Sequence, residues 1–407
     1  MADTTAQNNK PFVVEREIGG RTLRLETGQI AKLASSAVLA TYGGSSVLAT
    51  VVRADARPGL DFFPLQVDYR EKASAAGKFP GGFRKREGAP NEKEILTMRM
   101  IDRPIRPLFP DGFQDEVQIQ TWVMSHDGEN DTDVLAGTAA SAALALSDAP
   151  FEGPLATVRV GRLFDEDENV THVINPTVSQ LEYSDIDLVL SGHRDGLNMI
   201  ELGAAEIPEE ELLECIKFGE RHIAETLEMI DELVGKAGQE KRVGTLNTVP
   251  DEIAAKCGEA CEQAIIEART TGDKTERGDR IREIRKAFLD EHFPLNEDGT
   301  FRQYRESETA RKQASEAFRN LEKKVTRNLI VERGQRTDGR GFNEIRPIHM
   351  EVGRFERTHG SAMFQRGETQ SLVSCTLGTG RDEQIVDGLT PEYSKKFTLH
   401  YNFPPFC

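Results

Sequence analysis

The side chains best suited to chemistry lie in one short cationic stretch in the first third of the chain. Residues 77–110 read GKFPGGFRKREGAPNEKEILTMRMIDRPIRPLFP, and between Lys78 and Arg106 they hold eight Lys or Arg against four acids. The whole chain of 407 residues carries a formal net charge of −17, so this stretch runs against the overall balance. An acidic protein can still contact a phosphate backbone locally, because such contacts need only a stripe of positive charge.

The loop inside this stretch sets an aromatic ring among several cations. Gly81 and Gly82 make the loop flexible, and Phe83 is followed directly by three cations, which are Arg84, Lys85 and Arg86. This combination is used for single-stranded nucleic acid, since bases stack on the ring while cations follow the phosphates. The same residues also fit a solvated loop whose cations balance nearby acids, namely Glu87, Glu92 and Glu94. Spacing alone leaves both interpretations open.

Three further arginines extend the candidate nucleic-acid-binding set, and these are Arg99, Arg103 and Arg106. Arg99 falls on a predicted helix. The run DRPIR at residues 102–106 also fits an internal salt-bridge cluster, because Asp102 lies within reach of both following arginines. For these three residues the spacing slightly favours the structural interpretation.

The elements that must position these side chains are strands followed by helices. Alternating apolar and polar residues predict strands over 11–70 and again over 116–124, 155–163 and 186–190. Helical periodicity predicts helices over 91–101, 133–147 and 208–235. The helix at 91–101 has Asn91 as its N-cap, Glu94 three residues on, and Pro104 and Pro107 to end it. We expect an α+β fold for this first domain, residues 10–238.

Part of the chain occurs twice. Residues 26–50 read ETGQIAKLASSAVLATYGGSSVLAT, and residues 351–375 read EVGRFERTHGSAMFQRGETQSLVSC. Further on, FPLQVDY at 63–69 resembles FTLHYNF at 397–403. A repeat this long predicts duplicated domains rather than a solenoid of short units. Residues 239–330 between the copies are charge-rich with helical stripes and predict an all-helical domain, so the second copy spans 331–407.

Signals for other kinds of chemistry are missing or weak. The chain contains no G-x-x-x-x-G-K-[ST], no H-E-x-x-H and no nucleophile elbow. The acids of residues 127–133, DGENDTD, lack EF-hand spacing, and helix capping by Asp131 or Asp133 accounts for them. Cys257 and Cys261 lie four residues apart with no further ligands at metal spacing, so we expect core cysteines. No catalytic residue and no metal ligand is predicted.

Composition indicates a protein of the cytoplasm. The five cysteines are odd in number and scattered, which is typical of a reducing compartment rather than of a disulfide framework. The first residues, MADTTAQNNKPFVVE, have no basic and apolar signal-peptide pattern. No apolar run approaches the length that spans a bilayer, so we expect no membrane partner.

Several long motifs together resemble one family, polynucleotide phosphorylase (polyribonucleotide nucleotidyltransferase). They are GGFRKREG at 81–88, IDRPIRPLF at 101–109, DVLA at 133–136, ASAAL at 140–144, GSAMFQRGET at 360–369 and HYNFPP at 400–405. They occur in the family's order over nearly the whole chain. The resemblance implies a ribonuclease PH-like core of β-α-β layers, an all-α domain and the start of a second such core.

The resemblance also implies a reaction and its partners. The family degrades RNA by processive 3′-to-5′ phosphorolysis in mRNA turnover, with inorganic phosphate as co-substrate, nucleoside diphosphates as products and Mg²⁺ assisting. It implies a homotrimeric ring around a channel for single-stranded RNA, with partners in RNA-degradation complexes. By position, the role of the family's channel-lining loop falls on Phe83, Arg84, Lys85 and Arg86.

One departure from the family pattern bears on activity. The family's basic tract, serine-rich phosphate-binding turn and metal-binding aspartates follow its HYNFPP strand, and they have no counterpart in these 407 residues. We therefore expect no nucleoside diphosphate release by this chain alone. Two alternatives are a non-catalytic subunit that binds RNA or scaffolds the ring, and an unstable fragment. We also expect poor order in residues 331–407, because a half-built sheet leaves unpaired edges and an uncovered apolar face.

Overall fold

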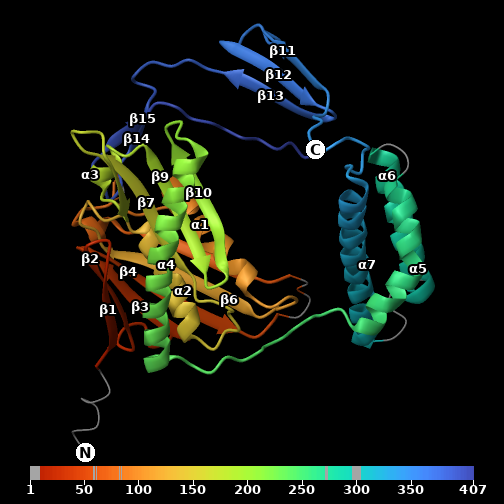
Figure 1. Ribbon diagram of the computed structural model, residues 1–407, viewed down its shortest axis with the longest axis horizontal. Helices are drawn as coiled ribbons and strands as arrows, with labels where there is room; N and C mark the ends of the chain where they lie inside the picture. Colours follow the sequence, from red (N-terminus) through yellow and green to blue (C-terminus); the bar gives the residue numbers. More distant parts are fainter. Residues whose placement is uncertain are drawn as a thin grey trace, which may run out of the picture. The chain divides into compact units, whose positions relative to one another are not determined.

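The computed structural model describes residues 10–57, 60, 62–81, 83, 85–270, 274–295 and 304–407. The chain forms two compact units (Figure 1). The first comprises Met1–Leu246 with Gln384–Cys407, and the second is Asn247–Glu383. Among the helices of the described residues, none is both long enough and apolar enough to cross a bilayer.

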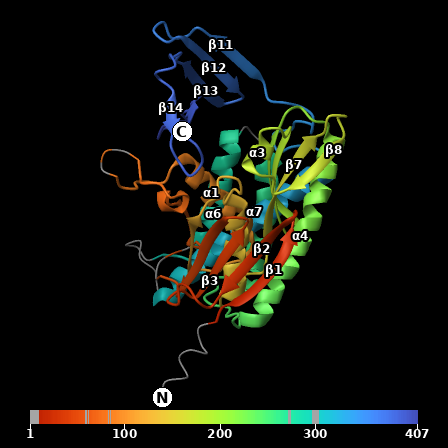
Figure 2. The ribbon, with the colours of Figure 1, turned by 90° about the vertical axis from the view of Figure 1, so that its left-hand side faces the viewer.

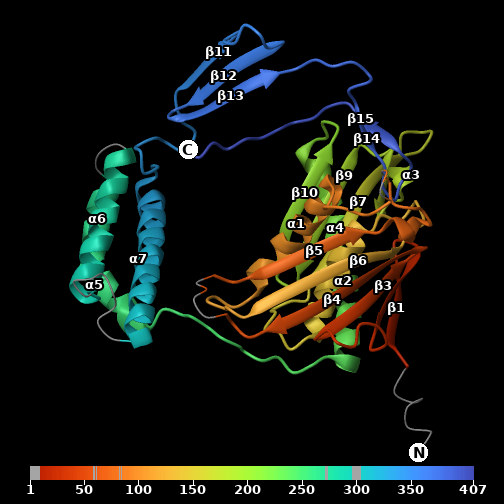
Figure 3. The same ribbon diagram turned by 180° about the vertical axis from the view of Figure 1, so that it is seen from behind.

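The first unit is built on a six-stranded sheet with the order β1-β2-β3-β4-β6-β5. Its strands are β1 (Phe12–Ile18), β2 (Arg21–Thr27), β3 (Ser36–Tyr42), β4 (Ser45–Ala54), β5 (Leu65–Glu71) and β6 (Glu116–Ser125). All neighbouring pairs are antiparallel except β5 and β6, which run parallel (Figure 3). Alternate residues of each central strand are buried, so one face of the sheet packs into the core.

A second sheet in the same unit has the order β10-β9-β7-β8 and is antiparallel throughout. Its strands are β7 (Ala156–Phe164), β8 (Val170–Ile174), β9 (Ile186–His193) and β10 (Gly196–Ala204). A one-turn helix, α3 (Val178–Leu181), joins β8 to β9. A hairpin of β14 (Gln384–Val386) and β15 (Tyr393–Lys395) also belongs to this unit, and Leu389 at its tip is buried in the main core.

Two helices lie between the sheets and complete β-α-β layers. Helix α2 (Asp133–Leu146) contacts β3, β4 and β6 of one sheet and β7 of the other. Helix α4 (Glu209–Ala237) contacts β7, β8 and β9 and also runs beside β1 (Figure 2). Every residue of α2 is buried, and its small side chains allow both sheets to approach closely. The α+β fold expected from the sequence is confirmed.

Helix α1 (Glu92–Ile105) begins as predicted and ends differently. The side chain of Asn91 accepts from the Glu94 N–H while the Glu94 carboxylate accepts from the Asn91 N–H, which is a complete capping box. The prediction that Pro104 ends the helix is wrong, since Pro104 lies inside it. A proline in the last turn costs only one hydrogen bond. The chain then continues as a 3-10 turn, η3 (Arg106–Leu108).

The described residues of the second unit form three helices and a small sheet. Helices α5 (Asp251–Thr270), α6 (Lys274–His292) and α7 (Tyr304–Arg333) pack around a core that includes Phe288 and Phe318. Cys257 and Cys261 are buried in this core, as predicted. The antiparallel sheet comprises β11 (Ile348–Val352), β12 (Gly360–Arg366) and β13 (Thr369–Cys375).

The two repeated segments form hairpins of the same kind. Strands β3 and β4 turn at Gly43, and β12 and β13 turn at Gly367. Both glycines have a positive φ, of 58° and 62°, which a residue with a side chain rarely adopts. Each tight turn therefore requires its glycine.

Candidate nucleic-acid interface

The loop between β5 and α1 presents its ring and cations to solvent. Phe83 is fully exposed, and Lys85 and Arg86 are exposed beside it. Arg84 and Gly82 lie outside the described residues. A second aromatic, Phe79, is also highly exposed in the same loop. Two exposed rings among cations are the elements of a stacking surface for single strands.

Ion pairs and hydrogen bonds fix both ends of this loop. The Glu87 carboxylate pairs with Lys72 at 2.7 Å and accepts from the Ala73 N–H at 3.0 Å, at the start of the 3-10 turn η2 (Ala73–Ala76). The hydrogen bond from Lys72 lowers the pKa of Glu87. Lys78 Nζ donates to the carbonyls of Gly388 and Thr390, each at 2.9 Å. These contacts fix both ends of the loop, while its tip stays exposed.

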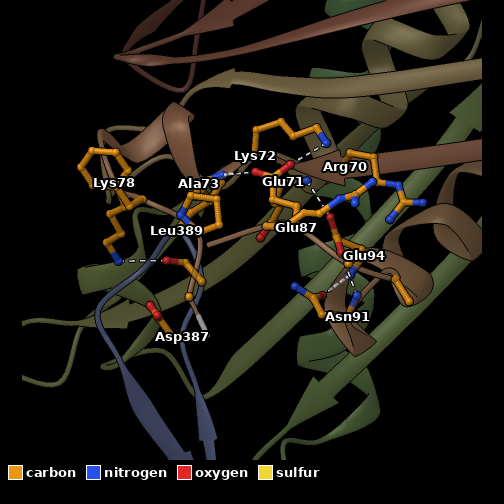
Figure 4. Close-up of a pocket in the computed structure, with 17 residues that line it drawn as sticks. Arg70, Glu71, Lys72, Ala73, Lys78, Glu87, Asn91, Glu94, Asp387 and Leu389 are labelled. Atoms are coloured by element: carbon orange, nitrogen blue, oxygen red, sulfur yellow. Dashed lines mark hydrogen bonds and ion pairs between the residues drawn. The ribbon is translucent and has the colours of Figure 1, made fainter. Parts of the chain in front are cut away.

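A cavity of about 230 Å³ lies under the loop (Figure 4). Four cations line it, and these are Arg70, Lys72, Lys78 and Arg86. Glu94, one of the acids in the lining, accepts from the backbone N–H groups of Glu71 and Asn91 at 2.8 and 2.7 Å. Part of its negative charge is thereby balanced by backbone dipoles. Glu71, Glu87 and Asp387 also line the cavity, which is therefore polar, with four cations and four acids.

The three arginines of α1 and η3 line a larger groove of about 1360 Å³. Arg106 pairs with Asp102 at 2.5 Å, as the ion-pair interpretation expects, whereas Arg103 pairs with Glu201 of β10 at 2.6 Å. Arg99 is exposed on α1. The groove and the loop cavity share lining residues, including Glu71 and Leu389. Of the described candidate cations, Arg86 lines the cavity and the three arginines line the groove, whereas Lys85 lines neither.

The groove is also lined by Arg159, which is buried, and by Lys93, which is half-exposed. Arg159 on β7 lies 2.8 Å from Asp133, 2.8 Å from Asp187 and 3.4 Å from Asp131. Lys93 on α1 lies 3.0 Å from Asp131 and 3.1 Å from Glu71. The prediction that Asp131 or Asp133 caps α2 is wrong, because the N-cap is Thr132 without a side-chain cap.

Burial and opposite charge act against each other in this cluster. Burial would lower the pKa of Lys93, but the carboxylates of Asp131 and Glu71 raise it above its usual value. Burial would likewise raise the pKa of Asp131, but Lys93 and Arg159 lower it to about 2. Asp133 differs, since burial raises its pKa beyond what Arg159 offsets. Lys93 and Asp131 are thus both ionised at neutral pH, and each stabilises the charge of the other.

We expect Asp131 to make stability depend on pH in the acid range. Its pKa is lower in the folded protein, so its contribution is complete above the unfolded pKa near 4 and is lost as pH falls towards 2. Between pH 5 and pH 2, wild type should lose about 2 kcal/mol more than Asp131→Asn. Urea unfolding at each pH measures this. Equal losses in the two proteins would contradict the assigned ion pairs.

Three family models match the chain. One described as 3′ exoribonuclease family, domain 1, matches residues 19–150 and again 344–407. Domain 2 of that family matches 153–222, and the RNA binding domain of polyribonucleotide nucleotidyltransferase matches 252–341. The double match of the first model confirms the internal repeat.

Similar full-length proteins share one name. The chain is 46% identical over 387 residues to the polyribonucleotide nucleotidyltransferase of Bacillus subtilis (strain 168), covering 95% of this chain and 53% of that protein. It is also 46% identical over 395 residues to that of Rhodopseudomonas palustris (strain ATCC BAA-98 / CGA009), covering 97% and 53%. The chain belongs to the polyribonucleotide nucleotidyltransferase family. It spans about half the length of the curated relatives it matches.

The family resemblance read from the motifs is therefore confirmed, and the relatives are named as nucleotidyltransferases acting on polyribonucleotides. Among solved structures, rice Rrp46 aligns with 56% of this chain and 97% of its own, at 14% identity and a TM-score of 0.41. The assignment to the polyribonucleotide nucleotidyltransferase family rests on the sequence matches.

Sequence reasoning missed three residues around the loop, which are Arg70, Lys72 and Phe79. Phe79 stands within the stretch already singled out, so its ring was visible there. Arg70 is the last residue of the stretch predicted as strands, and Lys72 lies two residues further on. Their convergence on the loop depends on how β5 leads into η2 and could not be read from spacing.

Proposed function

We propose that this chain takes part in 3′-to-5′ phosphorolysis of RNA during mRNA turnover. Inorganic phosphate attacks the terminal phosphodiester, a new P–O bond forms, and the bond to the preceding 3′ oxygen breaks. That oxygen takes up a proton, and a nucleoside diphosphate leaves. The observation that carries the proposal is the 46% identity, over 95% of the chain, to a polyribonucleotide nucleotidyltransferase.

Within this reaction, we assign the first unit to holding single-stranded RNA. Phe83 stacks a base, and Arg84, Lys85 and Arg86 contact phosphates. Arg99, Arg103 and Arg106 extend the track along the adjoining groove, with Arg99 the most available because the other two already hold carboxylates. The exposed rings beside cations support this assignment.

The proposal includes partners and a compartment. A homotrimeric ring would set three such loops around one RNA channel, in the cytoplasm and within RNA-degradation complexes. Basic loops gathered around a shared axis would concentrate positive charge on one strand, although the chain as a whole is acidic.

Mg²⁺ is the cation that the family implies for this reaction. Among the residues that the structure describes, no group of three or more His, Cys, Asp or Glu side chains is placed to hold a metal ion. The clustered acids that line the groove, Asp131 and Asp133, already hold Arg159 and Lys93. These residues do not fit a Mg²⁺ site, so no step is assigned to a metal bound by them.

Two measurements on the 407-residue chain test the proposal. Fluorescence anisotropy of a labelled oligo(A) measures RNA binding, and the release of ADP from poly(A) with phosphate and Mg²⁺ measures phosphorolysis. We expect salt-dependent binding without ADP release by this chain alone. Binding without turnover also fits the alternative of a non-catalytic RNA-binding subunit. Turnover at the rate of a full-length relative would contradict the expected inactivity, and absence of binding would overturn the RNA assignment.

A further inference from the structure

The outer face of the six-stranded sheet carries an exposed tryptophan. On β6, Val117, Ile119 and Val123 point into the core, whereas Trp122 and Met124 lie on the opposite face. Trp122 is 42% exposed and is the single tryptophan of the chain. Tryptophan is largely buried on average, so an indole ring this accessible is available for contact with a ligand.

Cations border this ring on the side of β5. In the register of the sheet, Trp122 lies opposite Arg70 of β5 and Leu48 of β4, so the three share one face. Lys72 Nζ lies 5.3 Å from the centre of the indole ring, within cation–π distance. The tryptophan therefore has an apolar neighbour on one side and two cations on the other, of which Arg70 pairs with Asp68 at 3.1 Å.

The same two cations connect Trp122 to the loop. Arg70 and Lys72 line the cavity under the loop together with Lys78 and Arg86. Lys72 also pairs with Glu87, which follows Arg86 directly in the chain. A row of paired cations and carboxylates thus continues from the loop through the cavity to the edge of the indole ring.

We propose that Trp122 is a second stacking residue for single-stranded RNA. One base lies on the indole, and Arg70 and Lys72 contact the phosphates that lead from it towards the loop. This inference rests on the proposed RNA binding and extends it from the loop to the sheet face. An accessible ring bordered by cations is the combination that binds single-stranded nucleic acid, since a base stacks on the ring while the cations contact phosphates.

The single tryptophan allows a direct measurement. Titrating the full chain with unlabelled oligo(A) should change Trp122 fluorescence and reduce its quenching by acrylamide, because a stacked base covers the ring. The midpoint should equal that found by anisotropy with labelled oligo(A). A duplex RNA should have little effect, since its bases are not free to stack.

Variants separate stacking from general effects. Trp122→Leu should weaken oligo(A) binding about ten-fold or more, and Trp122→Phe should retain most of it. A matched control is Phe164→Leu, because Phe164 on β7 is 46% exposed with the Arg162 guanidinium 5.2 Å from its ring centre. It should bind as wild type does. Circular dichroism checks that each variant is folded.

The outcomes distinguish the proposed role of Trp122 from the RNA binding on which it rests. If oligo(A) binds by anisotropy while Trp122 fluorescence and the affinity of Trp122→Leu stay unchanged, the inference is wrong and RNA binding by the loop stands. If oligo(A) does not bind at all, both are wrong. If the fluorescence follows protein dilution instead of RNA, the face is an interface between copies and the inference is overturned.

Discussion

Replacing Arg84, Lys85 and Arg86 together by glutamine should weaken RNA binding about 100-fold at 0.1 M salt. Each phosphate contact with a single strand contributes about 0.7 to the slope of log affinity against log salt. The triple variant should therefore lower that slope by about 2. Anisotropy of labelled oligo(A) across a salt series measures both quantities.

The control must remove the same charge elsewhere. Arg57, Arg194 and Lys217 are well exposed, and each already holds a carboxylate on the surface of the first unit. Changing these three to glutamine alters net charge equally but leaves the loop intact. If both triple variants lose affinity alike, binding is a property of overall charge, and the assignment of the loop fails.

Arg159→Met should destabilise the first unit by about 3–5 kcal/mol, because it leaves buried carboxylates without their partner. Asp133 suffers most, since it lies 2.8 Å from the guanidinium and is buried. Trp122 on β6 reports unfolding of this unit in urea, because it is the sole tryptophan and belongs to the first unit.

Arg24 offers a matched comparison at the surface. It also holds two carboxylates, those of Glu15 at 2.5 Å and Glu26 at 2.7 Å, but in contact with water. Arg24→Met should therefore cost less than about 1 kcal/mol. Adding Asp133→Asn to Arg159→Met should recover part of the loss by removing the unpaired charge. Equal costs at the two arginines would show that burial of the cluster adds nothing.

Local sequence signals predicted the helices and strands well. The wrong predictions concern residues whose interaction partners lie far along the chain. The Asn91 capping box was predicted because both of its residues lie within four positions of each other. Asp131 was misassigned because its partners, Lys93 and Arg159, lie 38 and 28 residues away. A rule based on neighbouring residues predicts capping whenever an acid precedes a helix. It does not include ion pairs with residues far along the chain.

The candidate site shows the same division. The ring and cations of the loop could be found because they are contiguous in sequence. Trp122 could not be joined to them, since its place beside Arg70 follows from parallel pairing of β5 with β6 across the intervening helix α1. Lys78 donates to the carbonyls of Gly388 and Thr390, which lie 310 and 312 residues further along the chain. No periodicity of the sequence predicts such a contact.

The closely packed helix α2 has a consequence for how freely the protein can vary. All of its residues are buried, and a Cβ atom on Gly137 would meet Thr157 Oγ1 at 2.7 Å. Larger side chains would force two sheets apart, and deleted ones would leave voids between them. In a saturation mutagenesis library, the amino acids tolerated along this helix should be limited to those of nearly native volume. The loop over residues 77–89 should tolerate many more.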